Sequence, residues 1–181
     1  MGSYVSGRHQ PIALSSPGGG RLVKHLPKHL RQRWRYLTVE IETWPDASPD
    51  RNAFQRNLWY AAQNLLGDVG SAEIDLTVIR FERWEGGGEA IVRIRRGEAD
   101  RARSVLTTLA QVDGDPVGLR VVGISGTVRA CEEKYMGGGP ERTGQRHVAV
   151  GDAERAAVVR DGRLDYREDD AFTGATLLDT E

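Results

Sequence analysis

Two histidines and one cysteine are the residues of this sequence most suited to metal binding or nucleophilic chemistry. His25 and His29 are four residues apart, a spacing that could place two metal ligands on one helical face. Pro27 lies between them and would interrupt such a helix, and no acidic residue or cysteine nearby completes a ligand set. Cys131 falls on the apolar side of a predicted helix, which favours a buried thiol over a nucleophile. We therefore expect no metal site here.

Other patterns that accompany catalysis are also incomplete. Asp113 and Asp115 flank Gly114, an arrangement typical of a turn rather than of a carboxylate pair. Gly86–Gly88 lacks the Lys-Ser/Thr pair of a phosphate-binding loop and is expected to turn a hairpin. The sequence therefore predicts no catalytic residue and no cofactor bound by the protein.

Positive charge gathers near the N-terminal end. The stretch KHLPKHLRQRWRYL, residues 24–37, holds five Lys or Arg and no acid. Residues 1–36 contain seven of the 25 Lys and Arg, which leaves 18 against all 26 acids in the rest of the chain. A basic arm on an acidic body is typical of proteins that contact nucleic acid, and the alternative is a solvated tail. Trp34 and Tyr36 either stack on a base or anchor this arm to the body.

A second basic group lies on the predicted strand EAIVRIRR, residues 89–96. Arg93 and Arg95 share one face of that strand, with Arg96 beside them. They could contact phosphates, or they could pair with the surplus acids of the body, and the pattern leaves both interpretations open. The strand carries no aromatic residue of the kind on which RNA-recognition modules stack bases, so we do not expect stacking on the open sheet.

Hydrophobic periodicity predicts the elements that must position these residues. Alternating apolar residues predict strands over residues 37–41, 74–78, 90–94 and 119–124, and helical spacing predicts helices over 49–66, 98–112 and 128–135. Ser48 is predicted to cap the first helix and Gly67 to end it. The order β-α-β-β-α-β predicts an α+β, ferredoxin-like two-layer sandwich with a short extra C-terminal helix.

Composition divides the chain into three predicted segments. Residues 1–22 form a disordered N-terminal extension, and Val23 is a candidate native start. Residues 23–136 form the domain, and residues 137–181 form an acidic, glycine-linked tail with a hairpin predicted around Asp161 and Gly162. No apolar run is long enough to span a membrane, no signal peptide is recognised and there is a single cysteine, so we expect a cytoplasmic protein.

Two stretches are more specific than these patterns. LPKHLRQRWRYLTVEIE (26–42) and GISGTVRACEEKYM (123–136) resemble the two ends of the archaeal ribonuclease P protein component 2 family. FQRNLWYAAQNLLGDVGSA (54–72) and EAIVRIRRGEADRAR (89–103) are similar to its salt-adapted members. The resemblance covers residues 23–136.

The resemblance implies a ferredoxin-like sandwich and a non-catalytic subunit of ribonuclease P. In this family the ribonuclease P RNA, with magnesium, removes the 5′ leader of precursor tRNA. The protein pairs with a barrel-fold subunit, component 3, commonly as a dimer of heterodimers. No membrane contact is implied.

Two sets of candidate site residues follow. The basic residues predicted to bind RNA are Lys24, Lys28, Arg31, Arg33, Arg35, Arg93, Arg95, Arg96 and Arg129. Large apolar residues on extra sides of the first helix and second strand predict a partner interface at Trp59, Tyr60, Leu66, Ile79 and Phe81. A larger, well-packed core is the alternative for the second set.

Two rival functions remain open on the sequence. One is a stand-alone RNA-binding module, for example a ribosome-associated factor, with the same arm and no obligate protein partner. The other is a small-molecule-binding regulatory domain of the same fold, which would leave the basic arm unexplained.

Overall fold

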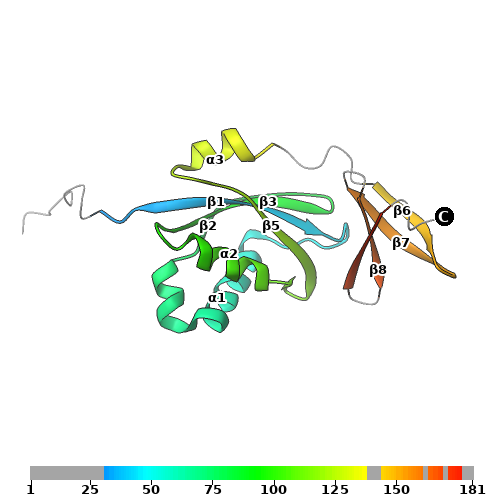
Figure 1. The fold of residues 1–181 in the computed structure, drawn as a ribbon. Helices are drawn as coiled ribbons and strands as arrows, with labels where there is room; N and C mark the ends of the chain where they lie inside the picture. Colours follow the sequence, from blue (N-terminus) through cyan, green and yellow to red (C-terminus); the bar gives the residue numbers. More distant parts are fainter. Residues whose placement is uncertain (1–30, 138–143, 161–162, 169–170, 177–181) are drawn as a thin grey trace, which may run out of the picture. The chain divides into compact units, whose positions relative to one another are not determined.

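A computed structural model describes residues 31–137, 144–160, 163–168 and 171–176 of the chain (Figure 1). The chain divides into two units, Met1–Arg31 and Gln32–Glu181, and every helix and strand described below belongs to the second. The elements are β1 (Trp34–Thr43), α1 (Arg51–Ile74), β2 (Thr77–Trp84), β3 (Gly87–Arg95), α2 (Ala99–Thr108), β4 (Gln111–Val112), β5 (Asp115–Ser125), α3 (Val128–Tyr135), β6 (Gly144–Val150), β7 (Ala153–Arg160), β8 (Arg163–Glu168) and β9 (Ala171–Thr176).

The first five strands form one antiparallel sheet in the order β2-β3-β1-β5-β4. Its two central strands pair with Trp34 opposite Arg95 and Val39 opposite Ala90. Because successive side chains alternate between faces, Leu37, Val39 and Ile41 all point to the same side of β1. All three are buried in the hydrophobic core, so this side is the core face of the sheet.

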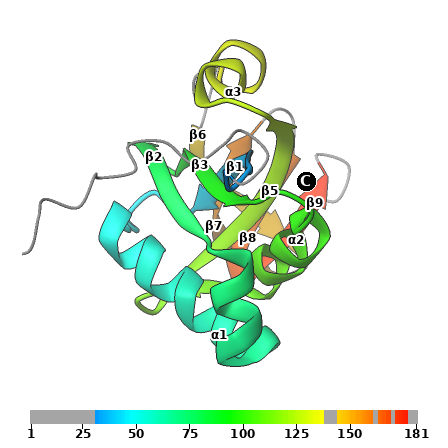
Figure 2. The same cartoon turned by 90° about the vertical axis from the view of Figure 1, so that its left-hand side faces the viewer.

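Helices α1 and α2 cover the core face, and α3 lies on the opposite face, as the two views in Figures 1 and 2 show. Phe54 and Leu58 of α1 and Val105 of α2 are fully buried against the strands. On the other face, the buried Cys131 of α3 contacts the backbone oxygen of Tyr36 through its thiol, at 3.3 Å. The prediction of a buried structural cysteine is confirmed.

The first helix begins and ends at residues other than those predicted. Asp50, not Ser48, is the N-cap, because its carboxylate accepts a hydrogen bond from the Ala53 N–H at 2.7 Å. Gly67 leaves the helical conformation with φ 69°, as predicted for an end, but the chain resumes the helix beyond this kink. Ile74 is therefore helical and fully buried rather than part of a strand, and Asp75 caps the helix in the left-handed region at φ 51°.

The second helix is shorter than its apolar pattern predicts. Helix α2 ends at Thr108, and Val112 belongs to the two-residue strand β4, which pairs with the start of β5. Asp113 and Gly114 both have positive φ, 53° and 96°, and form the tight turn between the two strands. Val112 is fully buried in β4. A valine at the end of a longer α2 would be buried as well, so an apolar residue at this position does not distinguish a helix from a strand.

A second antiparallel sheet, in the order β6-β7-β8-β9, follows α3. Strands β7 and β8 pair at the position of the predicted hairpin, whose Asp161-Gly162 turn lies outside the described residues. Arg160, 7% exposed, donates to the Asp165 carboxylate at 2.8 Å and to the backbone oxygens of Thr43 and Gly86. Strands β6 to β9 of the tail thus form a sheet separate from the first one. The helices and antiparallel sheets together confirm the predicted α+β class of the chain.

Candidate nucleic-acid interface

The arginines of the described residues fall into two groups according to their partners. Most of them lie within 4 Å of a carboxylate, as the alternative interpretation of the basic residues requires. The paired arginines are Arg56, Arg80, Arg93, Arg101, Arg103, Arg120, Arg129, Arg155, Arg160 and Arg167. The positive charge of these side chains is therefore largely balanced by carboxylates within the protein.

Four neighbouring arginines have no carboxylate partner among the described residues: Arg33, Arg35, Arg95 and Arg96. They lie where β1 begins and β3 ends. The Arg96 N–H donates to the Arg33 oxygen at 2.9 Å, and Arg35 pairs across the strands with Ile94. Figure 1 shows this end of the sheet, where β1 begins. We call these four residues the arginine end.

Other described arginines with no carboxylate within 4 Å do not extend this group. Arg51, at the start of α1, donates to the Val78 oxygen. Arg83 pairs with Gly88 near the β2–β3 turn, at the opposite end of the strands. Arg146 and Arg163 belong to the second sheet. The arginine end is therefore a local concentration of unneutralised positive charge, which is the electrostatic feature expected of a surface that binds a polyanion.

The remaining predicted RNA-binding residues have different surroundings. Arg93 lies 3.7 Å from an Asp75 carboxylate oxygen, and Arg129 donates to Glu133 at 2.6 Å one helical turn away. Arg31 is exposed at the start of the described chain, and Lys24 and Lys28 lie outside it. Thus the structure groups four of the nine predicted residues without carboxylate partners, and it gives Arg93 and Arg129 internal partners.

The start of α3 lies beside the arginine end because β5 pairs with the same strand. Tyr36 of β1 is opposite Ser125, and the next residue, Gly126, has the Arg35 guanidinium 3.5 Å from where a Cβ would stand. Thr127 then caps α3 by accepting a hydrogen bond from Ala130 at 3.2 Å. The Ser-Gly-Thr sequence therefore turns the chain closely past the first strand.

Carboxylates occupy the middle of the sheet face opposite the core, the face that also carries Arg95. Glu40, Glu89 and Glu82 follow one another across β1, β3 and β2 in directly opposed pairs. Glu89 is only 7% exposed, and one of its carboxylate oxygens has no hydrogen-bond partner among the described residues. Burial is the main cause that raises the pKa of Glu89, and the neighbouring Glu40 and Glu82 raise it further. Because Glu40 and Glu82 are paired with Arg120 and Arg80, the arginines without a carboxylate partner are left at the end of the sheet.

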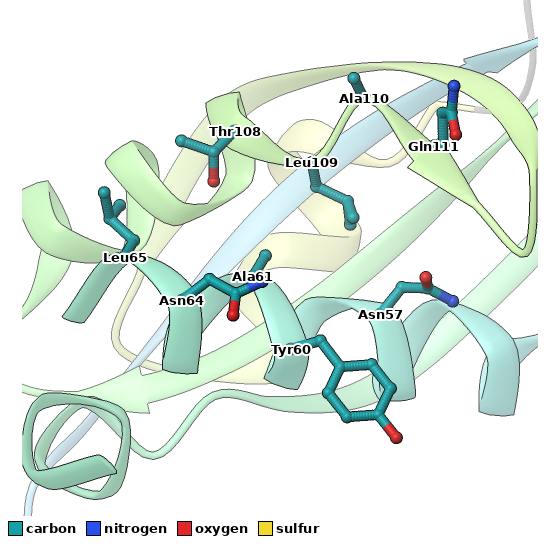
Figure 3. Close-up of a pocket in the computed structure, with 9 residues that line it drawn as sticks. All are labelled: Asn57, Tyr60, Ala61, Asn64, Leu65, Thr108, Leu109, Ala110 and Gln111. Atoms are coloured by element: carbon teal, nitrogen blue, oxygen red, sulfur yellow. The ribbon is translucent and has the colours of Figure 1, made fainter. Parts of the chain in front are cut away.

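A hollow of about 530 Å³ lies on the helical side, between α1 and the segment that joins α2 to β4 (Figure 3). Its lining is uncharged and is made of Asn57, Tyr60, Ala61, Asn64, Leu65, Thr108, Leu109, Ala110 and Gln111. In Figure 3 Tyr60 and Asn64 extend from α1, across from Thr108 at the end of α2. Sequence periodicity missed this site, because it depends on where α2 ends.

The predicted partner-interface residues do not form one surface. Trp59 and Tyr60 are 50% and 57% exposed, and Ile79 is also exposed on β2. Phe81, in contrast, packs on the core residue Phe54 with the ring centroids 5.6 Å apart. Leu66 is partly buried against the core as well. Trp59, Tyr60 and Ile79 thus remain candidates for contact, while Phe81 and Leu66 contribute to the core.

No three His, Cys, Asp or Glu side chains of the described residues are grouped so that they could hold a metal ion. Among the same residues, no helix has both the length and the apolar character needed to cross a membrane.

The fold and the arginine end define a small α+β protein with a surface suited to a polyanion. The chain belongs to the Rpp14/Pop5 family, whose model matches residues 35–136, from β1 to the end of α3. It is 63% identical over 159 residues to ribonuclease P protein component 2 of Haloarcula marismortui, which covers 87% of this chain and 99% of that protein. The same-named protein of Natronomonas pharaonis is 58% identical over 157 residues, 87% of this chain and 98% of that protein.

A more distant relative matches a shorter part of the chain. Ribonuclease P protein component 2 of Methanosarcina mazei is 32% identical over 114 residues, 63% of this chain and 93% of that protein. The 159 residues matched in the Haloarcula protein exceed the 136 residues that precede the tail. That match therefore reaches into the segment that carries the second sheet.

Proposed function

We propose that this chain is a non-catalytic protein subunit of ribonuclease P, which supports the RNA that removes the 5′ leader of precursor tRNA. The observation that carries the proposal is the 63% identity, over nearly the full length of the relative, to a protein named ribonuclease P protein component 2. The chain is then part of an endoribonuclease in which the RNA, with magnesium, performs the cleavage. It acts in the cytoplasm, where precursor tRNA is processed.

The arginine end supplies the contacts to RNA in this proposal. A guanidinium without a carboxylate partner can bind a phosphate without first giving up an internal ion pair. Arg33, Arg35, Arg95 and Arg96 meet this condition among the described residues, whereas the arginines paired with acids do not. Contacts of this kind offset the repulsion between phosphates and position the protein without reading sequence.

Component 3 is the proposed protein partner, and it binds on the helical side of the sheet. The support is the uncharged hollow, whose lining includes the exposed side chains of Tyr60 and Leu65. The arginine end, in contrast, is charged, so the two surfaces suit different partners. Two such pairs associate as a dimer of heterodimers. We also assign the elements from β1 to β5 to the ferredoxin-like arrangement, which their order and the central position of β1 and β3 support.

Reconstitution tests the function. The RNA, component 3 and magnesium are incubated with a 5′-extended precursor tRNA, with and without this chain, and cleavage at the mature 5′ end is followed. The proposal predicts faster cleavage when the chain is present. A chain that binds RNA, stays monomeric with component 3 and leaves cleavage unchanged would instead be a stand-alone RNA-binding module.

A further inference from the structure

The pairing of β1 with β3 brings two aromatic residues and two arginines together on the sheet face opposite the core. Trp34 is opposite Arg95, and Tyr36 is opposite Arg93. Directly opposed residues of antiparallel strands share a face, and Trp34 and Tyr36 are two residues apart on one strand. Neither aromatic residue belongs to the hydrophobic core cluster of the described residues.

One aromatic ring and one guanidinium of this group are already stacked. The Arg93 guanidinium carbon lies 4.1 Å from the centroid of the Trp34 ring. Arg93 is held there by a hydrogen bond to the Thr77 hydroxyl at 3.2 Å and by Asp75 at 3.7 Å. The stack therefore exists before any ligand binds, which reduces the ordering that binding would require.

The group also overlaps the arginine end, because Arg95 belongs to both. Arg95 is opposite Trp34 and has no carboxylate partner among the described residues, and its Nε is buried without a hydrogen-bond acceptor. Arg33 and Arg35 flank Trp34 in sequence and therefore point to the other side of the sheet, so Arg95 supplies the unpaired guanidinium on the Trp34 face. An apolar partner surface would not place an unpaired guanidinium beside a stacked tryptophan, whereas a nucleotide presents a flat ring and a phosphate that suit both groups.

We propose that Trp34 and Arg93 form a stacking platform for an unpaired nucleotide of the bound RNA, with Arg95 next to the phosphates that flank it. The inference rests on the proposed function and specifies the class of RNA bound at that surface, single-stranded rather than helical. The aromatic-free sequence of residues 89–96 predicted no base stacking on the sheet. Our proposal departs from that expectation because the register places Trp34 and Tyr36 of the neighbouring strand beside residues 93–95.

Stacking and charge can be separated by the salt dependence of binding. A base–aromatic stack is largely insensitive to salt, whereas each lost phosphate contact flattens the plot of log affinity against log salt. Trp34→Leu is therefore expected to weaken binding of a short oligouridine about tenfold with an unchanged salt slope. Trp34→Phe keeps a ring and is expected to retain most of the affinity. Trp84→Leu, a tryptophan beside the β2–β3 turn at the opposite end of the sheet, is the matched control and should leave oligouridine affinity unchanged.

Two further measurements locate the contact. Arg93→Lys keeps the charge but removes the planar group, so it should weaken oligouridine binding as Trp34→Leu does. In a chain whose Trp44, Trp59 and Trp84 are replaced by Phe, the fluorescence of Trp34 should be quenched by the oligouridine and not by the same strand in a duplex. Each variant is first shown to be folded by its thermal melt.

The outcomes distinguish this inference from the function on which it rests. Unchanged oligouridine affinity in Trp34→Leu, while the arginine variants lose RNA binding, would overturn the stacking platform and leave the proposed function intact. Equal losses for the oligouridine and the duplex would also overturn it, because the indole would then only position the arginines. Loss of component 3 binding with RNA binding unchanged would make this face a protein interface. No RNA binding by any folded form, including wild type, would overturn the proposed function itself.

Discussion

Glu89 of β3 is only 7% exposed, and one of its carboxylate oxygens has no hydrogen-bond partner among the described residues. It lies between Glu40 and Glu82, and its main hydrogen bond comes from the backbone N–H of Gly137. Because the pKa of Glu89 in the folded protein is raised above its ordinary value, folding favours the protonated carboxyl over the carboxylate relative to the unfolded chain. The stability linked to this proton is complete below the ordinary carboxyl pKa and is lost as pH rises through the raised value.

The substitution Glu89→Gln is therefore expected to stabilise the protein at neutral pH. The amide keeps an acceptor for Gly137 and removes a buried negative charge, and we expect a gain of about 1 kcal/mol in the free energy of unfolding. The gain should shrink as the pH is lowered toward 4, because wild type is protonated there. Urea unfolding at several pH values measures both effects, with the exposed Glu154→Gln as control. Equal stability of wild type and variant at neutral pH would contradict this account of Glu89.

At the scale of elements, side chains of helix α1 form hydrogen bonds with the backbone at the start of the edge strand β2. Gln55 accepts from the Val78 N–H at 2.6 Å and donates to the Leu76 oxygen at 3.3 Å. Trp59 donates to the same oxygen at 2.8 Å, and Arg51 donates to the Val78 oxygen. These contacts satisfy backbone groups that an edge strand otherwise leaves open for pairing with another chain.

Removing the Gln55 side chain should be costly for this reason. Gln55→Ala leaves the buried Val78 N–H without its acceptor, and we expect the free energy of unfolding to fall by about 1–3 kcal/mol. Gln63→Ala makes the same change at an exposed position of the same helix and should stay within about 0.5 kcal/mol of wild type. Chemical denaturation compares the two. Similar values for both variants would show that the edge strand does not depend on Gln55.

Helix α3 depends on a close approach to β5. A Cβ at Gly123 would overlap the Tyr135 ring near its attachment to the chain, so the ring and the helix would have to move. Gly123→Ala should lower the free energy of unfolding by about 1–3 kcal/mol. Gly118→Ala, in the same strand, meets only the Glu42 side chain at 3.4 Å and should be close to neutral. A thermal melt of each variant tests this, and equal melting temperatures would contradict the packing described here.

The elements that sequence reasoning predicted well are those with an unambiguous period. The alternation around Val39 and the spacing around Cys131 each have one solution, and β1 and α3 occur where expected. The kink at Gly67 and the strand at Val112 were missed, because a glycine also suits a helix end and a buried valine suits either element. The meeting of Trp34 with Arg93 depends on strand register, and the lack of acid partners at Arg95 depends on tertiary contacts, so neither follows from local pattern.

At the scale of the whole molecule, the two surfaces should be separable by substitution. Tyr60→Arg introduces a charge at the uncharged hollow and is expected to weaken component 3 binding at least tenfold, with RNA affinity not reduced. Val69→Arg adds the same charge at a residue that is 74% exposed beyond the kink and serves as control. Calorimetric titration with component 3 measures the affinities. Equal affinities for both variants and wild type would remove the hollow from the proposed partner surface.

The measurement that tests the central claim most directly is the salt dependence of RNA affinity for two charge-matched variants. In one, Arg33, Arg35, Arg95 and Arg96 are changed to Gln; in the other, the acid-paired Arg56, Arg80, Arg101 and Arg120 are changed. Both lose the same net charge. We expect the first to bind ribonuclease P RNA more weakly, with a slope of log affinity against log salt reduced by about 0.7 to 0.9 for each lost phosphate contact.

The second variant should keep a slope close to that of wild type, because its arginines are engaged with carboxylates. Equal slopes for the two variants would show that RNA responds only to overall charge. That result would contradict the claim that the unpaired arginine end is the surface through which this protein binds RNA.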